Sequence, residues 1–449
     1  MKKSAILMAL AATGAASVGF AQQDVTVTWM TGNTAQSFQF AQESAQRYMD
    51  ANPHTIGGED YNVTVEVTQG PESATDKYAL YLQLFEAQSG DADLLEVDVI
   101  WPGDLAQHLV DFYQYEGVEE DMQAHFPAIV ENNTVDGKLV GIPMFTDAGL
   151  LYYRTDLLEE YGYDGPPETW TELQEMATTI MEGEGADNPD FTGFVWQGDA
   201  YEGLTCNALE WVASFGGGNF ISPEGEIEVF SDQNVAALDT AASWVGTISP
   251  QAVTGFLEED SRQIFQNGNA VFMRNWPYAY SLATADDSAI KDSVGIAPLP
   301  SGEGDGAAPA ATLGGWQMGV NAYSENVDVS VDVARFLTSE SEQLQRAIEV
   351  SNLPTIESVY QSEELLNSNV AWFAELLPVF QNAVARPSTV SAPRYNEASR
   401  LIYAAVHSVL TGDVDAETAM DELEIELEDL TGLPVQGADL GSDTSFASR

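Results

Sequence analysis

The sequence has little of several features that mark common classes of protein. Its 449 residues include a single cysteine, Cys206, which excludes a disulfide framework. It has only 15 lysines and arginines against 71 aspartates and glutamates, and its formal net charge is −56. A charge of that sign repels phosphate groups, which argues against nucleic acid and anionic membranes as partners. The acids are spread along the whole chain, so they favour a solvated surface suited to a saline milieu over one metal-binding face.

Recognisable catalytic motifs are also missing. The sequence contains no GxSxG elbow, P-loop or HExxH motif, and its four histidines stand singly. Paired carboxylates could serve a glycosidase, but among 71 acids such pairs arise by chance and identify nothing. We therefore expect a binding protein rather than an enzyme, with no cofactor and no metal. A secreted glycoside hydrolase and a purely structural acidic surface protein remain the alternatives.

The one long uncharged apolar run lies at the N-terminus. Lys2 and Lys3 precede an apolar segment of small residues, and Gly19 and Ala21 place small side chains where a signal peptidase reads them. The segment is too short for a membrane anchor. We expect residues 1–21 to be a cleaved signal peptide and the protein to be periplasmic. Removing them would take away two lysines and no acids, changing the net charge from −56 to −58.

Strand and helix patterns alternate along the rest of the chain. Residues 25–32, 61–69 and 93–101 have the apolar patterns of strands, whereas 37–53 and 76–90 have the spacing of amphipathic helices. This alternation indicates an α/β fold with mostly parallel sheets. The length suggests two domains, and a hydrophobic content of 44% is ample for packed cores.

Several later segments carry clear local signals. Pro102 favours a helix over 102–113, and two strand-like runs are separated by "TDAG" at 146–149. A proline-opened helix is expected over 166–185. Residues 434–449 have the composition of a flexible tail.

Three aromatic segments are the best candidates for a binding site. "VIWPGD" (99–104) and "RNWPYAY" (274–280) both run from a strand through Trp and Pro into a helix, where ligands of open α/β sheets bind. Either tryptophan could instead be core. "LGGWQMG" adds Trp316 beside two glycines that let backbone approach a ligand closely. Aromatic faces suit the C–H face of a pyranose, while carboxylates and a guanidinium suit its hydroxyl rim. The chemistry favours a sugar.

Six blocks of sequence resemble the trehalose/maltose-binding proteins of bacterial and archaeal sugar ABC transporters. They span essentially the whole chain in the same order: "IPMFTDAGLLYYRTDLL", "PPETWTELQEMA", "GFVWQGDAYEGLTC", "RNWPYAYSL", "ATLGGWQMGV" and "NAVARP". The resemblance implies a type II periplasmic-binding-protein fold, in which two α/β lobes joined by a hinge close on a ligand in the cleft. It also implies a monomer that captures an alpha-glucoside disaccharide such as trehalose or maltose and delivers it to a membrane permease.

The same resemblance implies how the chain divides. Residues 22–142 and 295–340 would form the first lobe. Residues 143–294 and 341–433 would form the second. The hinge crossings would lie in "GKLVGIP" and "VGIAPLP", at 137–143 and 294–300.

The family's ligand residues can be placed on matching motifs. The resemblance implies that Asp98 and Asp147 accept from sugar hydroxyls, Asp147 from the other lobe. Stacking on a ring is expected of Trp276, with Tyr278 adding a contact. The remaining members of the implied site are Gly314, Gly315 and Trp316 as the opposing wall, Arg386 as a donor, and Glu202, which could equally be a rim residue or a helix cap.

Three positions depart from the family pattern. Gln36, Ser37 and Gln39 stand where a glutamate is expected in the first helix, and Lys77 with Tyr78 where an arginine is expected in the second. Phe145 replaces a tyrosine. These changes imply that one sugar subsite is retained and the other is altered, so a glucosylated compatible solute is an alternative ligand.

Overall fold

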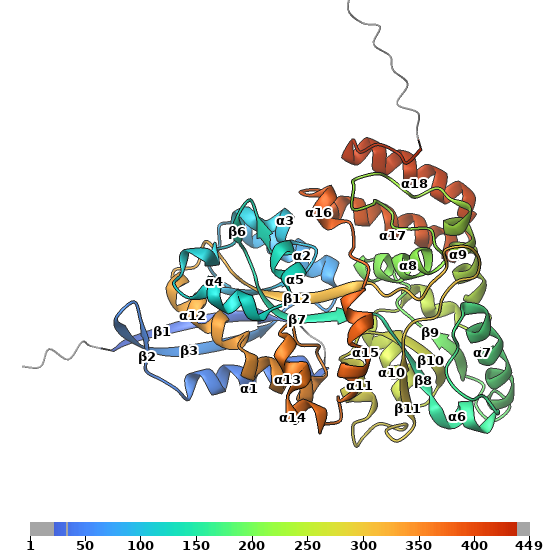
Figure 1. Cartoon of the computed structure of the whole chain (residues 1–449), viewed down its shortest axis with the longest axis horizontal. Coiled ribbons are helices and arrows are strands. Elements are labelled where there is room, and N and C mark those ends of the chain that lie inside the picture. Colours follow the sequence, from blue (N-terminus) through green and yellow to red (C-terminus); the bar gives the residue numbers. More distant parts are fainter. Residues whose placement is uncertain (1–21, 33–34, 438–449) are drawn as a thin grey trace, which may run out of the picture.

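The computed structural model describes residues 22–32 and 35–437. The expected signal peptide at 1–21, and residues 438–449 of the expected tail, lie outside the described residues. The described chain forms two lobes, each with its own β-sheet covered by helices (Figure 1). Within residues 22–32 and 35–437, no helix combines the length and the apolar composition needed to cross a membrane.

The first lobe is built on a six-stranded sheet. β1 pairs in parallel with β3 and β4, whereas β12 runs antiparallel to both β4 and β7. All five residues of β4 are buried, and Leu94 and Leu95 join different hydrophobic clusters, because successive side chains of a strand point to opposite faces. In spatial order the strands are β2 (His54–Ile56), β3 (Glu59–Gln69), β1 (Gln23–Thr31), β4 (Leu94–Asp98), β12 (Leu313–Val320) and β7 (Ile142–Ala148).

Helices cover both faces of this sheet. One cluster contains residues of α1 (Ala35–Met49) and α12 (Val327–Leu337), and α13 (Glu340–Val350) packs against both helices. The other cluster contains Tyr81 and Phe85 of α2 (Ala74–Glu86). The remaining short elements of this lobe are α3 (Pro102–Leu105), α4 (Val118–Asp121), α5 (Pro127–Asn132), β5 (Thr134–Val135) and β6 (Lys138–Leu139).

The second lobe is built on a smaller sheet of four strands. β8 runs antiparallel to β10 and β11, and β10 is parallel to β9. Tryptophans fill its core: the ring centres of Trp170 and Trp244 are 5.3 Å apart, and those of Trp196 and Trp211 are 5.1 Å apart. In spatial order the strands are β11 (Val294–Ala297), β8 (Leu150–Arg154), β10 (Ala270–Asn275) and β9 (Thr192–Val195).

Helices surround the smaller sheet, and C-terminal helices extend the lobe (Figure 1). They are α6 (Thr155–Glu160), α7 (Trp170–Glu184), α8 (Glu202–Ser214), α9 (Asp232–Trp244), α10 (Glu258–Gln266), α11 (Ala279–Ala283), α15 (Trp372–Gln381), α16 (Ser388–Ser391), α17 (Tyr395–Thr411) and α18 (Ala416–Thr431). The range 341–433 was expected in the second lobe, but α13 at its start packs against α1 and α12 of the first lobe, and α14 (Glu363–Leu366) packs against α13.

The chain changes sheets later than the sequence suggested. Residues 143–148, expected in the second lobe, belong to β7 of the first sheet because Asp147 and Thr146 pair with Gly314 and Gly315 of β12. Only Gly149 separates β7 from β8, so "TDAG" is not a connection. A side chain at Gly149 would overlap the Glu210 carboxylate, which explains the glycine at this crossing.

The crossing from the second lobe back to the first also lies later in the chain than the sequence suggested. Residues 294–297, around the expected boundary at 294/295, form β11, which pairs with β8 of the second sheet. The chain rejoins the first sheet at Leu313, so the crossing falls in residues 298–312. The expected hinge segment at 137–143 therefore stops short of the first crossing at Gly149, whereas the one at 294–300 overlaps only the first three residues of the second crossing.

Two further local expectations need correction. The helix expected over 102–113 ends at Leu105 and continues only as short 3-10 turns, because Leu109 and Val110 instead pair with the end of β12. The expected tail does not begin at 434. The backbone N–H of Ile227 donates to Pro434 at 2.8 Å, and that of Gln436 donates to Ile227 at 2.9 Å.

Candidate functional site

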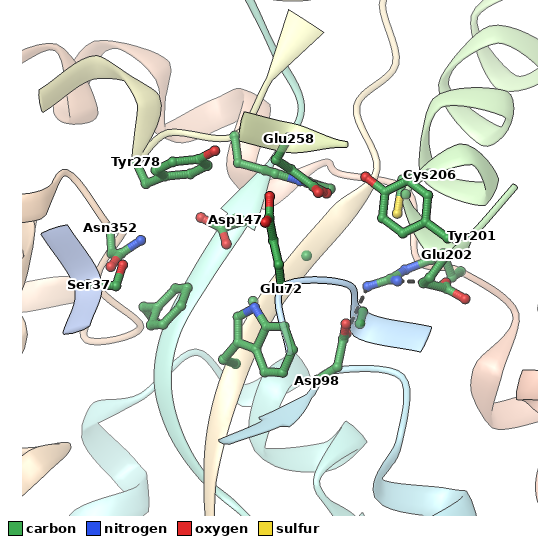
Figure 2. Close-up of a pocket in the computed structure, with 18 residues that line it drawn as sticks. Ser37, Glu72, Asp98, Asp147, Tyr201, Glu202, Cys206, Glu258, Tyr278 and Asn352 are labelled. Carbon is green, nitrogen blue, oxygen red and sulfur yellow. Dashed lines mark hydrogen bonds and ion pairs between the residues drawn. The ribbon is translucent and has the colours of Figure 1, made fainter. Parts of the chain in front are cut away.

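A cavity lies between the two lobes and is lined by residues of both (Figure 2). It holds about 120 Å³ of water-accessible space, well above the ~10–15 Å³ that one water needs. Of the eleven residues expected in the site, all but Lys77 line it: Asp98, Phe145, Asp147, Glu202, Trp276, Tyr278, Gly314, Gly315, Trp316 and Arg386.

Three adjacent strands of the first sheet bring one group of these residues together. Trp316 of β12 stands opposite Asp98 of β4 and Phe145 of β7. Gly315 has φ +125°, and a side chain there would come within 2.6 Å of the Phe145 carbonyl oxygen. This backbone shape fits only glycine and accompanies a change of register after Trp316.

The sheet pairing corrects one expectation about Asp147. Asp98 and Asp147 were expected to face the ligand from opposite lobes, but β4 and β7 belong to the same sheet. Phe145, which also lies on β7, is likewise a first-lobe residue. The three departures from the family pattern, at residues 36–39, at 77–78 and at Phe145, thus all fall on the first lobe.

Asp147 is a buried carboxyl with one oxygen that no described residue contacts by a hydrogen bond. Its side chain lines the cavity, the residue is 8% exposed, and its Oδ1 has no hydrogen-bond partner among the described residues. Burial, and then the negative charge of Asp98, raise the pKa of Asp147 well above its ordinary value. Buried polar atoms are nearly always hydrogen-bonded, so Oδ1 is poised to accept a hydrogen bond from a ligand in the cavity.

Arg386 joins the two lobes by ion pairs. Its guanidinium lies 3.0 Å from Asp98 Oδ1 of the first lobe and 2.7 Å from Glu202 Oε1 of α8 in the second. All three residues are buried. The Arg386 Nε has no hydrogen-bond partner among the described residues, which leaves one donor for a ligand.

Glu202 is largely occupied within the protein. Besides Arg386, it accepts hydrogen bonds from the hydroxyls of Tyr395 and Ser399, both at 2.6 Å. Burial raises the pKa of Glu202 although Arg386 opposes the shift. Its main contact is therefore with the protein, and it positions Arg386 at the wall of the cavity.

The two expected stacking rings each have a cation against one face. The Arg274 guanidinium carbon lies 3.9 Å from the centre of the Trp276 ring, and Lys77 Nζ lies 4.0 Å from that of Trp316. Neither cation lines the cavity, so both lie behind the rings. Each is paired with a carboxylate, Arg274 with Glu210 and Lys77 with Glu96 at 3.7 Å. Lys77 thus supports Trp316 from behind.

The two Trp-Pro junctions have different roles. Trp276 lines the cavity, and its Nε1 donates to Glu258 at 3.4 Å. Trp101 is 1% exposed, packs edge-on against Tyr81 with ring centres 5.8 Å apart, and does not line the cavity. Tyr278 lines the cavity, but its hydroxyl donates to Glu259 at 2.8 Å. The sequence left open whether each tryptophan lies in the cavity or in the core: Trp276 lies in the cavity and Trp101 lies in the core.

Several cavity residues were not found from the sequence. Glu258 begins α10, where acids are common because of the helix dipole, so its residue type gave no signal. Ser37 was considered only as a departure from the family pattern. The others are Glu72, Ala74, Tyr201, Gly203, Cys206 and Asn352. Across the part of the chain that the structure describes, no group of three or more His, Cys, Asp or Glu side chains is arranged to hold a metal ion.

Comparison with known proteins gives related chains of similar length. The probable ABC transporter-binding protein of Deinococcus radiodurans is 45% identical over 433 residues, which cover 96% of this chain and 99% of that protein. The structure of maltose-bound T. maritima MalE3 is 40% identical, with a TM-score of 0.84, and covers 90% of this chain and 100% of that chain.

A more distant structure supports the same two-lobed fold. The GacH receptor of Streptomyces glaucescens GLA.O has a TM-score of 0.79 at 23% identity, over 92% of this chain and 99% of that one. The matching proteins are binding proteins, which confirms that this chain is not an enzyme. A family model described as bacterial extracellular solute-binding protein matches residues 31–344. The chain belongs to that family.

Proposed function

We propose that this protein captures an alpha-glucoside disaccharide, such as trehalose or maltose, outside the cytoplasmic membrane and delivers it to an ABC permease. The observation that carries the proposal is the cavity between the lobes, lined by Trp316 of the first and Trp276 of the second. Their faces match the apolar faces of two sugar rings, and Asp98, Asp147 and Arg386 provide groups for hydroxyls. The likeness to maltose-bound T. maritima MalE3 supports the same ligand class.

Capture would couple to closure of the lobes. A ligand bridging Trp276 and Trp316 contacts both lobes only when they are close together, so it stabilises the closed state by that difference in contacts. A permease would then recognise the closed shape of a monomeric binding protein. The crossings at Gly149 and at residues 298–312 would serve as the hinge.

The test is a calorimetric and fluorescence screen of trehalose, maltose, sucrose and glucosylglycerol. We expect saturable one-to-one binding of at least one of them, with no release of glucose on prolonged incubation. Preference for glucosylglycerol would favour the alternative ligand, a glucosylated compatible solute. If none binds, and Trp316→Ala behaves as the parent protein does with every ligand tested, the proposed site is wrong.

A further inference from the structure

The cavity between the lobes has an excess of negative charge at one end. Five carboxyl side chains line the cavity, but among its lining residues only Arg386 is a cation. Arg386 already pairs with Asp98 and Glu202. The other three carboxyl groups, Glu72, Asp147 and Glu258, have no cation beside them in the cavity lining.

These three side chains converge from different elements. Figure 2 shows the carboxyl groups of Glu72, Asp147 and Glu258 pointing toward the same part of the cavity. Glu72 precedes α2 and Asp147 is in β7, both in the first lobe, whereas Glu258 begins α10 of the second. Closure of the lobes therefore brings like charges together, which costs free energy unless a ligand or protons neutralise them.

The buried side chain of Asp147 is independent evidence that a ligand binds at this end of the cavity. It is 8% exposed and faces the cavity, and its Oδ1 has no partner among the described residues. The nearby guanidinium of Arg274 does not fill this role, because it lies behind Trp276 and forms a two-point hydrogen-bonded pair with Glu210. Trp276 Nε1 donates to Glu258 but carries no charge, so a positively charged group that also donates hydrogen bonds would complement this end of the cavity.

Two other kinds of occupant fit less well. A metal ion needs ligands gathered at coordination distance, and no such group occurs among residues 22–32 and 35–437. A neutral hydroxyl donates one hydrogen bond and leaves the charges uncompensated. Burial raises the pKa values of Asp147 and Glu258, and partial desolvation followed by the charges of Glu259 and Glu258 raises that of Glu72, as expected where charge on the carboxylates is disfavoured. An ammonium group supplies three donors and one positive charge at once.

We propose that the ligand is an aminated glycoside whose protonated amine lies between Glu72, Asp147 and Glu258. The proposal rests on the proposed function, because it places the amine on a sugar that stacks between Trp276 and Trp316. The ring faces contact the tryptophans and the amine contacts the carboxyl groups, so the contributions of stacking and of charge can be measured separately.

The test compares trehalose and maltose with derivatives in which one hydroxyl is replaced by an amino group, and with the N-acetylated form of each derivative. We expect at least one amine to bind tenfold or more tightly than its parent sugar by titration calorimetry, and N-acetylation to abolish that advantage. The advantage should fall at least fivefold in Asp147→Asn and Glu258→Gln. Glu422→Gln, which removes an exposed acid on α18, should retain it.

Glu72→Gln keeps the test decisive if the buried variants fold poorly, because Glu72 is exposed at the edge of the cavity. It should lower the advantage of the amine without changing the thermal midpoint. If every amine binds no tighter than its neutral parent, the amine proposal is overturned and the proposed function stands. If neither parents nor amines bind, the proposed function fails as well.

Discussion

Replacing Arg386 with methionine should destabilise the protein strongly, because the guanidinium neutralises two buried carboxylates. Asp98 and Glu202 are 6% and 4% exposed, and each pairs directly with Arg386. Removing one partner of a buried ion pair costs about 3–5 kcal/mol, since it leaves an uncompensated charge. At about 2–4 °C per kcal/mol, the thermal midpoint should fall by roughly 6–20 °C.

The loss should depend on pH in a definite direction. Burial already raises the pKa of Glu202 in the folded protein, and removing Arg386 would raise it further. A folded state that holds a proton more tightly than the unfolded state loses stability as pH rises. Between the ordinary pKa of a glutamate and the raised value, the deficit of Arg386→Met should therefore grow as pH rises, and should be smaller at pH 5 than at pH 7.

The assay is denaturant unfolding of the ligand-free protein at both pH values, followed by tryptophan fluorescence. Arg394→Met is the matched control, because Arg394 is exposed and pairs with exposed Glu397 one helical turn away. Such a surface pair is worth at most about 1 kcal/mol. An Arg386→Met variant as stable as the control at pH 7 would refute the argument that the guanidinium neutralises these carboxylates.

Three further predictions follow from the site and the crossing. Trp276→Ala should weaken sugar binding by about 1–3 kcal/mol in titration calorimetry, by analogy with stacked rings elsewhere, and an unchanged affinity would remove Trp276 from the site. Lys77→Met should weaken it by about 0.5–2 kcal/mol, because Trp316 loses the cation 4.0 Å behind its ring; the change should also shift the tryptophan emission. Gly149→Ala should lower the free energy of unfolding by about 1–3 kcal/mol through its clash with Glu210, whereas Gly165→Ala, where a side chain meets nothing within 4 Å, should not.

The spacing of apolar residues and the positions of proline and glycine predicted most strands and helices well, because these patterns lie within short stretches of sequence. The strand patterns of β4 and β10, and the Trp-Pro turn that follows each of them, were visible in the sequence, and the structure contains both strand-to-turn junctions. The sequence pattern could not show whether the ring of Trp101 or of Trp276 points into the core or into the cavity. Trp101 is held in the core by contacts with Tyr81 of α2, a helix that precedes it in the chain.

The lobe to which Asp147 belongs could not be read from nearby sequence either. Its place in the first lobe is fixed by pairing with Gly314, which lies far along the chain. The same holds for Glu258, which begins α10 of the second lobe and lines the cavity together with residues of the first lobe. Residues whose role depends on long-range pairing are therefore the ones that local pattern misses.

The most direct test of the central claim is titration of the parent protein and Trp276→Ala with neutral and aminated alpha-glucosides. The account predicts saturable one-to-one binding of at least one ligand to the parent, and binding weaker by about 5–150-fold in the variant, which corresponds to the loss of one stacked ring. Absence of binding by every ligand, or equal affinities in the two proteins, would contradict a sugar site between these lobes.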